Sequence, residues 1–275
     1  MRTFTGRVAA ITGAASGIGR ALALELAGRG CHLALCDVDE AGLTETAGRC
    51  RAHGVTVSTR SVDVAEEPAV FAWADQSAAE HGAVHLLVNN AGVALIATVE
   101  EAKLADLRWL MGINYWGVVH GTKAFLPYLK ASGEGHIVNL SSVFGLVSVP
   151  TQAAYNSAKF AVRGFSDALR MELEIEGAPV SVTTVHPGGV KTNIAKAART
   201  YGAGTAMSGG ASEASAFERM AFTTPDRAAR RILAAVQRDR RRVLVGPDAA
   251  AIDLISRLPP SLYQRAIVRG ARRRR

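Results

Sequence analysis

The chain has 275 residues, of which 48% are hydrophobic and 20% charged, and its formal net charge is +8. This hydrophobic content excludes a disordered chain, which combines low hydrophobicity with high net charge. No apolar run approaches the roughly 20 residues of a membrane-spanning helix, and the N-terminus does not resemble a signal peptide. Cys31, Cys36 and Cys50 lack metal-ligand spacing and the histidines form no paired motif, so we expect a reduced, cytoplasmic protein without a metal site.

The basic excess is confined to the C-terminal part of the chain. Residues 219–275 contain 15 Arg, no Lys and four acidic residues, a net charge of +11, whereas residues 1–218 carry −3. We interpret this basic segment as a charged helix on the solvated surface of the protein. Peripheral membrane contact through residues 252–268 and packing on a neighbouring subunit are the two alternatives. The tail has few aromatic residues and no recognisable nucleic-acid-binding motif, so we expect no nucleic-acid partner.

Short β-branched runs alternate with helical stretches through most of the chain. The expected strands are Val8–Thr12, His32–Asp37, Thr56–Asp63, His85–Asn89, His136–Leu140 and Val180–His186. The expected helices span residues 18–29, 40–53, 66–81, 103–131 and 153–176. Such alternation predicts a parallel sheet with helices on both faces. The fold class is therefore α/β, a doubly wound Rossmann-type domain, and we expect residues 1–275 to form this one domain.

The chain beyond the sixth expected strand is less regular. Residues 194–223 contain a stretch rich in Gly, Ala and Ser, which we interpret as a loop that closes over the substrate. A helix is expected from Thr224 to about Arg238, followed by a last strand at Val243–Val245. Residues 249–275 are expected to form a basic extension with short apolar helical faces.

A glycine-rich turn follows the first expected strand. Its cofactor-binding candidates are Gly13, Ser16, Gly17, Ile18 and Gly19, in a GxxxGxG spacing. Glycines permit a tight turn, and they allow a pyrophosphate to approach the N–H groups at a helix N-terminus. A turn that only packs the helix on the strand is the alternative. The position of the glycine-rich turn directly after the first expected strand favours nucleotide binding.

Asp37 ends the second expected strand, 18 residues after Gly19. A carboxylate at this position can accept hydrogen bonds from the adenosine ribose hydroxyls and would repel a 2′-phosphate. Neither Ser16 nor Val38 supplies a positive charge, so NAD is preferred over NADP. Arg20 is the nearest basic residue and the main argument for NADP.

Tyr155 and Lys159 are four residues apart on the expected helix 153–176, which places them on one face. A phenol has an ordinary pKa of about 10. An ammonium about 4 Å away would lower this pKa by roughly 3 units at an effective dielectric constant of about 20. The spacing therefore predicts a phenol that titrates near neutral pH and exchanges a proton with an alcohol or a ketone.

Together these motifs resemble the short-chain dehydrogenase/reductase family. Further matches are Asn89-Asn90-Ala91-Gly92, Asn114, Ser142 and the run from Pro187 to Thr192, in the family's order. The resemblance implies that Asn114, Ser142, Tyr155 and Lys159 are catalytic. It also implies that Tyr155 and Lys159 contact the cofactor. The other residues that the resemblance places at the cofactor are Asp63, Val64, Asn90, Ala91, Gly92, Pro187, Gly188, Val190 and Thr192.

The resemblance implies an NAD(H)-dependent oxidoreductase that interconverts a secondary alcohol and a ketone and forms a homodimer or homotetramer. The Met and Phe residues that flank the 194–223 loop favour an apolar or moderately large substrate. A non-catalytic nucleotide-binding scaffold and an NADP(H)-dependent carbonyl reductase are the alternatives.

Overall fold

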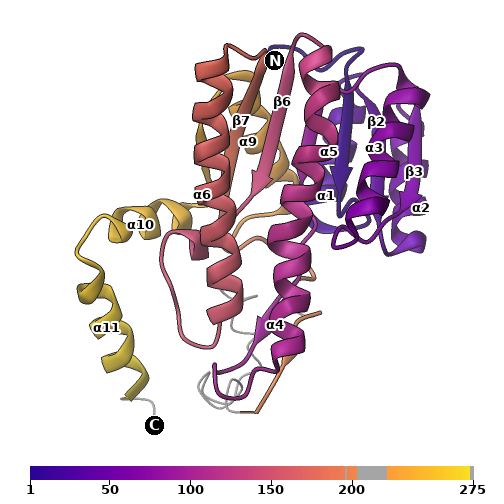
Figure 1. The fold of residues 1–275 in the computed structure, drawn as a ribbon. Coiled ribbons are helices and arrows are strands. Elements are labelled where there is room, and N and C mark those ends of the chain that lie inside the picture. The colour runs from indigo at the N-terminus through magenta and orange to yellow at the C-terminus, as the bar shows by residue number, and fades with distance from the viewer. Residues whose placement is uncertain (196, 203–221, 273–275) are drawn as a thin grey trace.

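The computed structural model describes residues 1–195, 197–202 and 222–272. Seven strands form one parallel sheet in the order β3-β2-β1-β4-β6-β7-β9 (Figure 1). They are β1 (Val8–Thr12), β2 (His32–Asp37), β3 (Val57–Ser61), β4 (Leu86–Asn89), β6 (Gly135–Leu140), β7 (Val180–Pro187) and β9 (Arg242–Val245). β1 pairs with both β2 and β4, so the chain winds outward in both directions from this point. This order confirms the predicted doubly wound sheet.

Helices cover both faces of the sheet, as predicted (Figure 1). The first face packs against α1 (Gly17–Ala27), α2 (Glu40–Arg51) and α9 (Pro225–Gln237). The second packs against α3 (Glu67–His81), α5 (Gly117–Ala131) and α6 (Ala153–Glu176). Two further helices, α10 (Pro247–Ser256) and α11 (Pro260–Arg272), follow the last strand.

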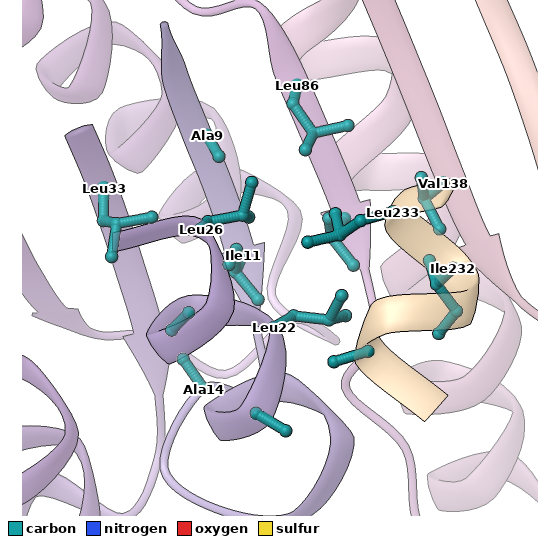
Figure 2. Packing of buried hydrophobic residues seen from close by; sticks show 14 of the residues in the cluster. Ala9, Ile11, Ala14, Leu22, Leu26, Leu33, Leu86, Val138, Ile232 and Leu233 are labelled. Atoms are coloured by element: carbon teal, nitrogen blue, oxygen red, sulfur yellow. The ribbon is translucent and has the colours of Figure 1, made fainter. Parts of the chain in front are cut away.

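The core beside the glycine turn lies between α1, α9 and the centre of the sheet (Figure 2). Leu22 and Leu26 point from one face of α1 onto Ile11 of β1, and Leu233 of α9 approaches from the side. All four side chains are fully buried. Each such burial contributes about 1.5–3 kcal/mol to folding, so this packing fixes the start of α1 against the end of β1.

Two local features differ from the sequence prediction. The expected helix 103–131 is interrupted, because a π-helical segment (Gly112–Trp116) separates α4 (Leu104–Met111) from α5. In addition, β5 (Leu95–Ile96) and β8 (Arg199–Thr200) pair in parallel as a second, two-stranded sheet that was not predicted. The π-helical segment carries Asn114, and widened turns of this kind are frequent at functional sites.

Two histidines are fully buried on neighbouring strands, His136 in β6 and His186 in β7. Burial lowers the pKa of His136 from 6.5 to about 3 and that of His186 to about 4. The unfolded chain therefore binds protons below pH 6.5 that the native chain does not. This difference makes the native state progressively less stable as the pH falls from about 6.5 towards 4.

We expect urea unfolding to show a loss of about 2 kcal/mol for each of these histidines between pH 6.5 and pH 5. His136 contacts the Thr183 hydroxyl through Nε2 at 2.8 Å. His136→Gln supplies a polar, non-titrating side chain at this position, so it should remove about half of the histidine-dependent slope. A variant with the same pH dependence as the parent chain would contradict this account.

Candidate active site

The glycine turn connects β1 to α1 and leaves no room for a Cβ at Gly13 or Gly19. Gly13 and Gly17 have φ of +66° and +54°, a conformation that favours glycine. A Cβ on Gly13 would lie 2.8 Å from Asn90 Nδ2, and one on Gly19 would lie 2.1 Å from the Gly13 carbonyl oxygen. The turn thus forms a bare backbone cradle at the N-terminus of α1, where N–H groups and the helix dipole favour a phosphate.

Thr12 and Asn90 hold this cradle against the end of β4. The Thr12 hydroxyl accepts hydrogen bonds from the N–H groups of Asn90 and Ala91 at 2.9 and 3.0 Å. Asn90 Nδ2 donates to the carbonyl oxygens of Thr12 and Gly13 at 2.9 and 3.0 Å. The sequence analysis missed Thr12. Only its place as the residue directly before Gly13 could have indicated this role.

Asp37 lies beside the cradle at the end of β2. Its Oδ2 accepts a hydrogen bond from the Ala15 N–H at 2.9 Å, and its Oδ1 accepts one from the Asp39 N–H at 3.0 Å. These bonds fix the carboxylate next to the turn. Each oxygen has a second lone pair for a further donor.

Arg20, the sequence-based argument for NADP, is engaged within the protein. Its guanidinium donates to the Thr46 hydroxyl at 3.0 Å and to the Ala15 carbonyl at 2.5 Å, and it forms an ion pair with Glu45 at 3.0 Å. These interactions anchor α1 to α2. Because the guanidinium already binds these protein groups, it is not free to bind the 2′-phosphate of NADP.

Ser142, Tyr155 and Lys159 meet at the carboxyl end of β6. Ser142 follows this strand, and its hydroxyl accepts a hydrogen bond from the Phe144 N–H at 3.1 Å. Tyr155 and Lys159 come from the first two turns of α6, as their spacing predicts. The Tyr155 hydroxyl hydrogen-bonds with Ser142, and Lys159 Nζ lies 5.5 Å from the centroid of the phenol ring.

The electrostatics of this group differ from the sequence prediction. Burial of the hydroxyl raises the pKa of Tyr155 to about 12, and the hydrogen bond with Ser142 offsets only part of this increase. Burial also lowers the pKa of Lys159 to about 8. The Lys159 ammonium donates to the Leu140 carbonyl at 2.8 Å and lies over the ring. The predicted phenol pKa near 7 is therefore wrong for the phenol in this structure, because desolvation outweighs the hydrogen bond with Ser142.

Asn114 and Gly92 connect this group to the cradle. The fully buried Asn114 amide donates to the Val93 carbonyl and accepts from the Val93 N–H, both at 2.8 Å. A Cβ on Gly92 would lie 3.3 Å from Asn114 Oδ1 and 3.7 Å from Lys159 Nζ. The segment that contains Asn90, Ala91 and Gly92 therefore extends from the glycine turn to Lys159.

The segment after β7 closes the other side of the cradle. A Cβ on Gly17 would lie 3.1 Å from Thr192 Cγ2, so Thr192 lies directly over the turn. Val190 is buried and bridges to Thr223. Asp248, which the sequence analysis missed, accepts a hydrogen bond from the Gly189 N–H at 2.6 Å, and its Oδ2 would lie 2.0 Å from a Cβ on Gly188. The only feature of the sequence that pointed to Asp248 was the Gly-Pro-Asp start of α10.

The remaining predicted residues lie at the margins of this site. Asp63 is exposed and accepts a hydrogen bond from the Ala65 N–H at 2.9 Å, while Val64 is buried against α5. Pro187 ends β7. Most of the predicted loop 194–223 lies outside the described residues, but its first part is anchored at β8, where Arg199 forms an ion pair with Asp106 at 2.5 Å.

Neither a metal-ligand cluster nor a membrane-spanning helix occurs in the part of the chain that the structure describes. Within residues 1–195, 197–202 and 222–272, no group of three or more His, Cys, Asp or Glu side chains is arranged to hold a metal ion. In the same ranges, no helix has the length and apolar content to cross a bilayer.

Comparison with known proteins identifies the family. The profile of the family described as short chain dehydrogenase matches residues 7–201. SadH of Mycobacterium tuberculosis, named as an oxidoreductase, is 48% identical over 273 residues, which are 98% of this chain and 97% of SadH. Human estradiol 17-beta-dehydrogenase 11 is 38% identical over 198 residues, 71% of this chain and 65% of that protein.

A solved structure gives the same result. The short chain dehydrogenase/reductase of Burkholderia phymatum in complex with NAD superposes with a TM-score of 0.86 at 33% identity, covering 92% of this chain and 94% of that chain. The doubly wound sheet, the glycine cradle and the Ser, Tyr and Lys side chains at the same sheet edge define a Rossmann-type oxidoreductase. The chain belongs to the short-chain dehydrogenase/reductase family.

Proposed function

We propose that the chain is an NAD(H)-dependent oxidoreductase that interconverts a secondary alcohol and a ketone. The arrangement of Ser142, Tyr155 and Lys159 beside the glycine cradle carries this proposal. The site fits a dinucleotide, because the cradle has no space for a Cβ and the Asp37 carboxylate is fixed next to it. The NAD-bound Burkholderia structure supports the same cofactor.

Bound NAD would supply the hydride acceptor or donor. Gly13, Gly17 and Gly19 would hold its phosphates, Asp37 the adenosine ribose, and Val190 and Thr192 its nicotinamide end. Lys159 would bind the nicotinamide ribose from its buried position between Leu140 and the phenol ring.

Tyr155 would transfer the proton at the substrate oxygen, and Ser142 would hydrogen-bond the same oxygen as charge develops on it. In ketone reduction the phenol is the proton donor, and burial keeps it protonated. In alcohol oxidation the phenolate is the base. We therefore infer that alcohol oxidation becomes faster, and ketone reduction slower, as the pH rises.

The structure favours NAD over NADP through two side chains. Asp37 places a negative charge beside the cradle, and the Arg20 guanidinium is already bound by Thr46, Glu45 and Ala15. Calorimetry should give at least about tenfold tighter binding of NADH than of NADPH, since uncompensated like charge costs more than about 1.4 kcal/mol. Asp37→Asn should narrow this difference while Asp39→Asn, a neighbouring control, should not. Tighter NADPH binding by the parent chain would refute the assignment.

An apolar, moderately large substrate fits the surroundings of Tyr155. The phenol packs with a cluster of apolar side chains that includes Val93, Leu95 and Leu110. The name of the human relative, an estradiol dehydrogenase, supports a bulky secondary alcohol. A homodimer or homotetramer and a cytoplasmic location remain part of the proposal.

A non-catalytic nucleotide-binding scaffold is the competing function. The buried Lys159 argues against it, because placing an ammonium where its pKa falls to about 8 is costly and serves no packing purpose. A screen of alcohols and ketones distinguishes the two, since the scaffold would bind NADH without turnover.

A further inference from the structure

The last two helices form an arm that leaves the body of the protein (Figure 1). We define the arm as α10 and α11, residues 247–272. α10 is attached to the body, because Asp253 pairs with Arg242 of β9. α11 contains no buried residue, and its described hydrogen bond to the body runs from the Ser148 N–H to the Tyr263 hydroxyl at 3.2 Å. Contacts within this chain therefore leave most of the arm uncovered.

Apolar side chains follow one another along this uncovered arm. Leu254, Leu258 and Leu262 occur at intervals of four residues and are 68%, 52% and 51% exposed. Ile255 is 41% exposed beside them. Leu254 lies on α10, Leu258 in the turn between the helices and Leu262 on α11, and we call this group the leucine strip. Isolated exposed leucines are common, but several on one arm indicate a binding surface.

Arginines lie on the same side of α11 as Leu262. Arg265, Arg269 and Arg272 recur at spacings of four and three residues and so lie on one side of the helix. At 100° per residue, Leu262 falls about 60° from Arg265 and beside Arg269, whereas Ile267 falls on the opposite side. Among the residues that the structure describes, no ion pair to these three arginines is found, in contrast to Arg257, which pairs with Asp253 at 3.1 Å.

The charge of the arm identifies the surface that complements it. The arm contains four Arg and two Asp, a net charge of +2, and with the three Arg that follow it in the sequence the net charge of residues 247–275 is +5. Arginines beside exposed leucines suit a segment that lies in the plane of a membrane, because the long arginine side chains can reach the headgroups while the leucines insert. An anionic bilayer supplies phosphates for the arginines and acyl chains for the leucines together.

A second copy of the chain matches the arm less well. The groove between the arm and the body, about 560 Å³ in volume, is lined by α6, the loop before α6, Val99 and Gln264 of α11. None of its lining residues is charged, so the equivalent groove on another copy offers no carboxylate to the arginines. We propose that the α10–α11 arm docks the protein on anionic lipid surfaces, with the leucine strip inserted and the arginines at the headgroups.

Vesicle flotation of the full-length protein tests this proposal without relying on turnover. We expect binding to phosphatidylcholine vesicles that contain about 30% phosphatidylglycerol, and at least about tenfold weaker binding to phosphatidylcholine alone. Raising the salt concentration should weaken the binding. The double variant Leu258→Glu/Leu262→Glu and the triple variant Arg265→Gln/Arg269→Gln/Arg272→Gln should each reduce binding at least about tenfold.

Matched controls separate the arm from general basicity. The triple variant Arg60→Gln/Arg230→Gln/Arg238→Gln removes the same charge from exposed positions outside the arm, and Ile175→Glu alters an apolar side chain that is 87% exposed on α6. Both should retain vesicle binding. No binding by the parent chain, or equal losses in the control and arm variants, would overturn the proposal. So would a leucine variant that changes the oligomeric state by light scattering while its vesicle binding persists, since this outcome assigns the strip to a second copy.

Discussion

Replacing Tyr155 with Phe should abolish turnover and leave NADH binding intact. The variant removes one hydroxyl, which hydrogen-bonds with Ser142 and is the proposed proton donor and acceptor. Loss of a positioned acid-base group lowers kcat by about 100- to 10,000-fold. The ring still packs edge-on against Phe144, whose centroid lies 6.2 Å away, so the local packing is preserved. Steady-state kinetics measure the turnover, and calorimetry on the same preparation measures the affinity for NADH.

Tyr128→Phe is the matched control for this variant. Its hydroxyl donates to the Asp75 carboxylate at 2.6 Å on the protein surface, away from the site. We expect this control to keep full turnover. Comparable activity in Tyr155→Phe and Tyr128→Phe would show that the Tyr155 phenol does not transfer the proton.

Gly19→Ala should sharply weaken cofactor binding. The added methyl would lie 2.1 Å from the Gly13 carbonyl oxygen and 2.6 Å from Asn90 Nδ2, so the turn must move away from α1. Forcing a methyl group into a packed site costs about 1–3 kcal/mol. If the cofactor bears that cost, its dissociation constant rises about 5- to 150-fold. NADH calorimetry measures the change, and a thermal melt of the same sample reports on folding.

Gly48→Ala supplies the comparison, because Gly48 lies in α2 with nothing within 4 Å of a built Cβ. Alanine is favoured over glycine in a helix by about 0.5–1 kcal/mol. This control should therefore melt at a slightly higher temperature and bind NADH normally. If Gly19→Ala retains both the affinity and the melting temperature of the parent chain, the glycine cradle does not hold the cofactor.

The sequence was sufficient for the parallel sheet because its signals are local. Each strand of the main sheet is a short apolar run, and each flanking helix has a buried face that recurs within its own residues. Tyr155 and Lys159 were placed together for the same reason, because one helix face carries both. Ser142 was joined to them by the family resemblance, and the structure places it just after the end of β6.

Other features depend on contacts between distant segments. β5 and β8 have two residues each, and Leu95 of one pairs with Arg199 of the other. Neither strand is long enough to show a hydrophobic period in the sequence. Asp248 reaches Gly189 only because β7 and β9 lie side by side. The phenol pKa was predicted in the wrong direction because helical spacing does not reveal how strongly the hydroxyl is desolvated, or that Lys159 donates to Leu140.

The most direct test of the proposed function is to incubate the parent chain with NAD⁺ and a graded series of apolar secondary alcohols, and to follow NADH absorbance. The proposed function predicts NADH formation with at least one alcohol, at a rate that rises with pH. It also predicts that the corresponding ketone is reduced when NADH is supplied. Binding of NAD⁺ without NADH formation from any alcohol, and without reduction of any matching ketone, would contradict the proposed reaction and favour the non-catalytic scaffold.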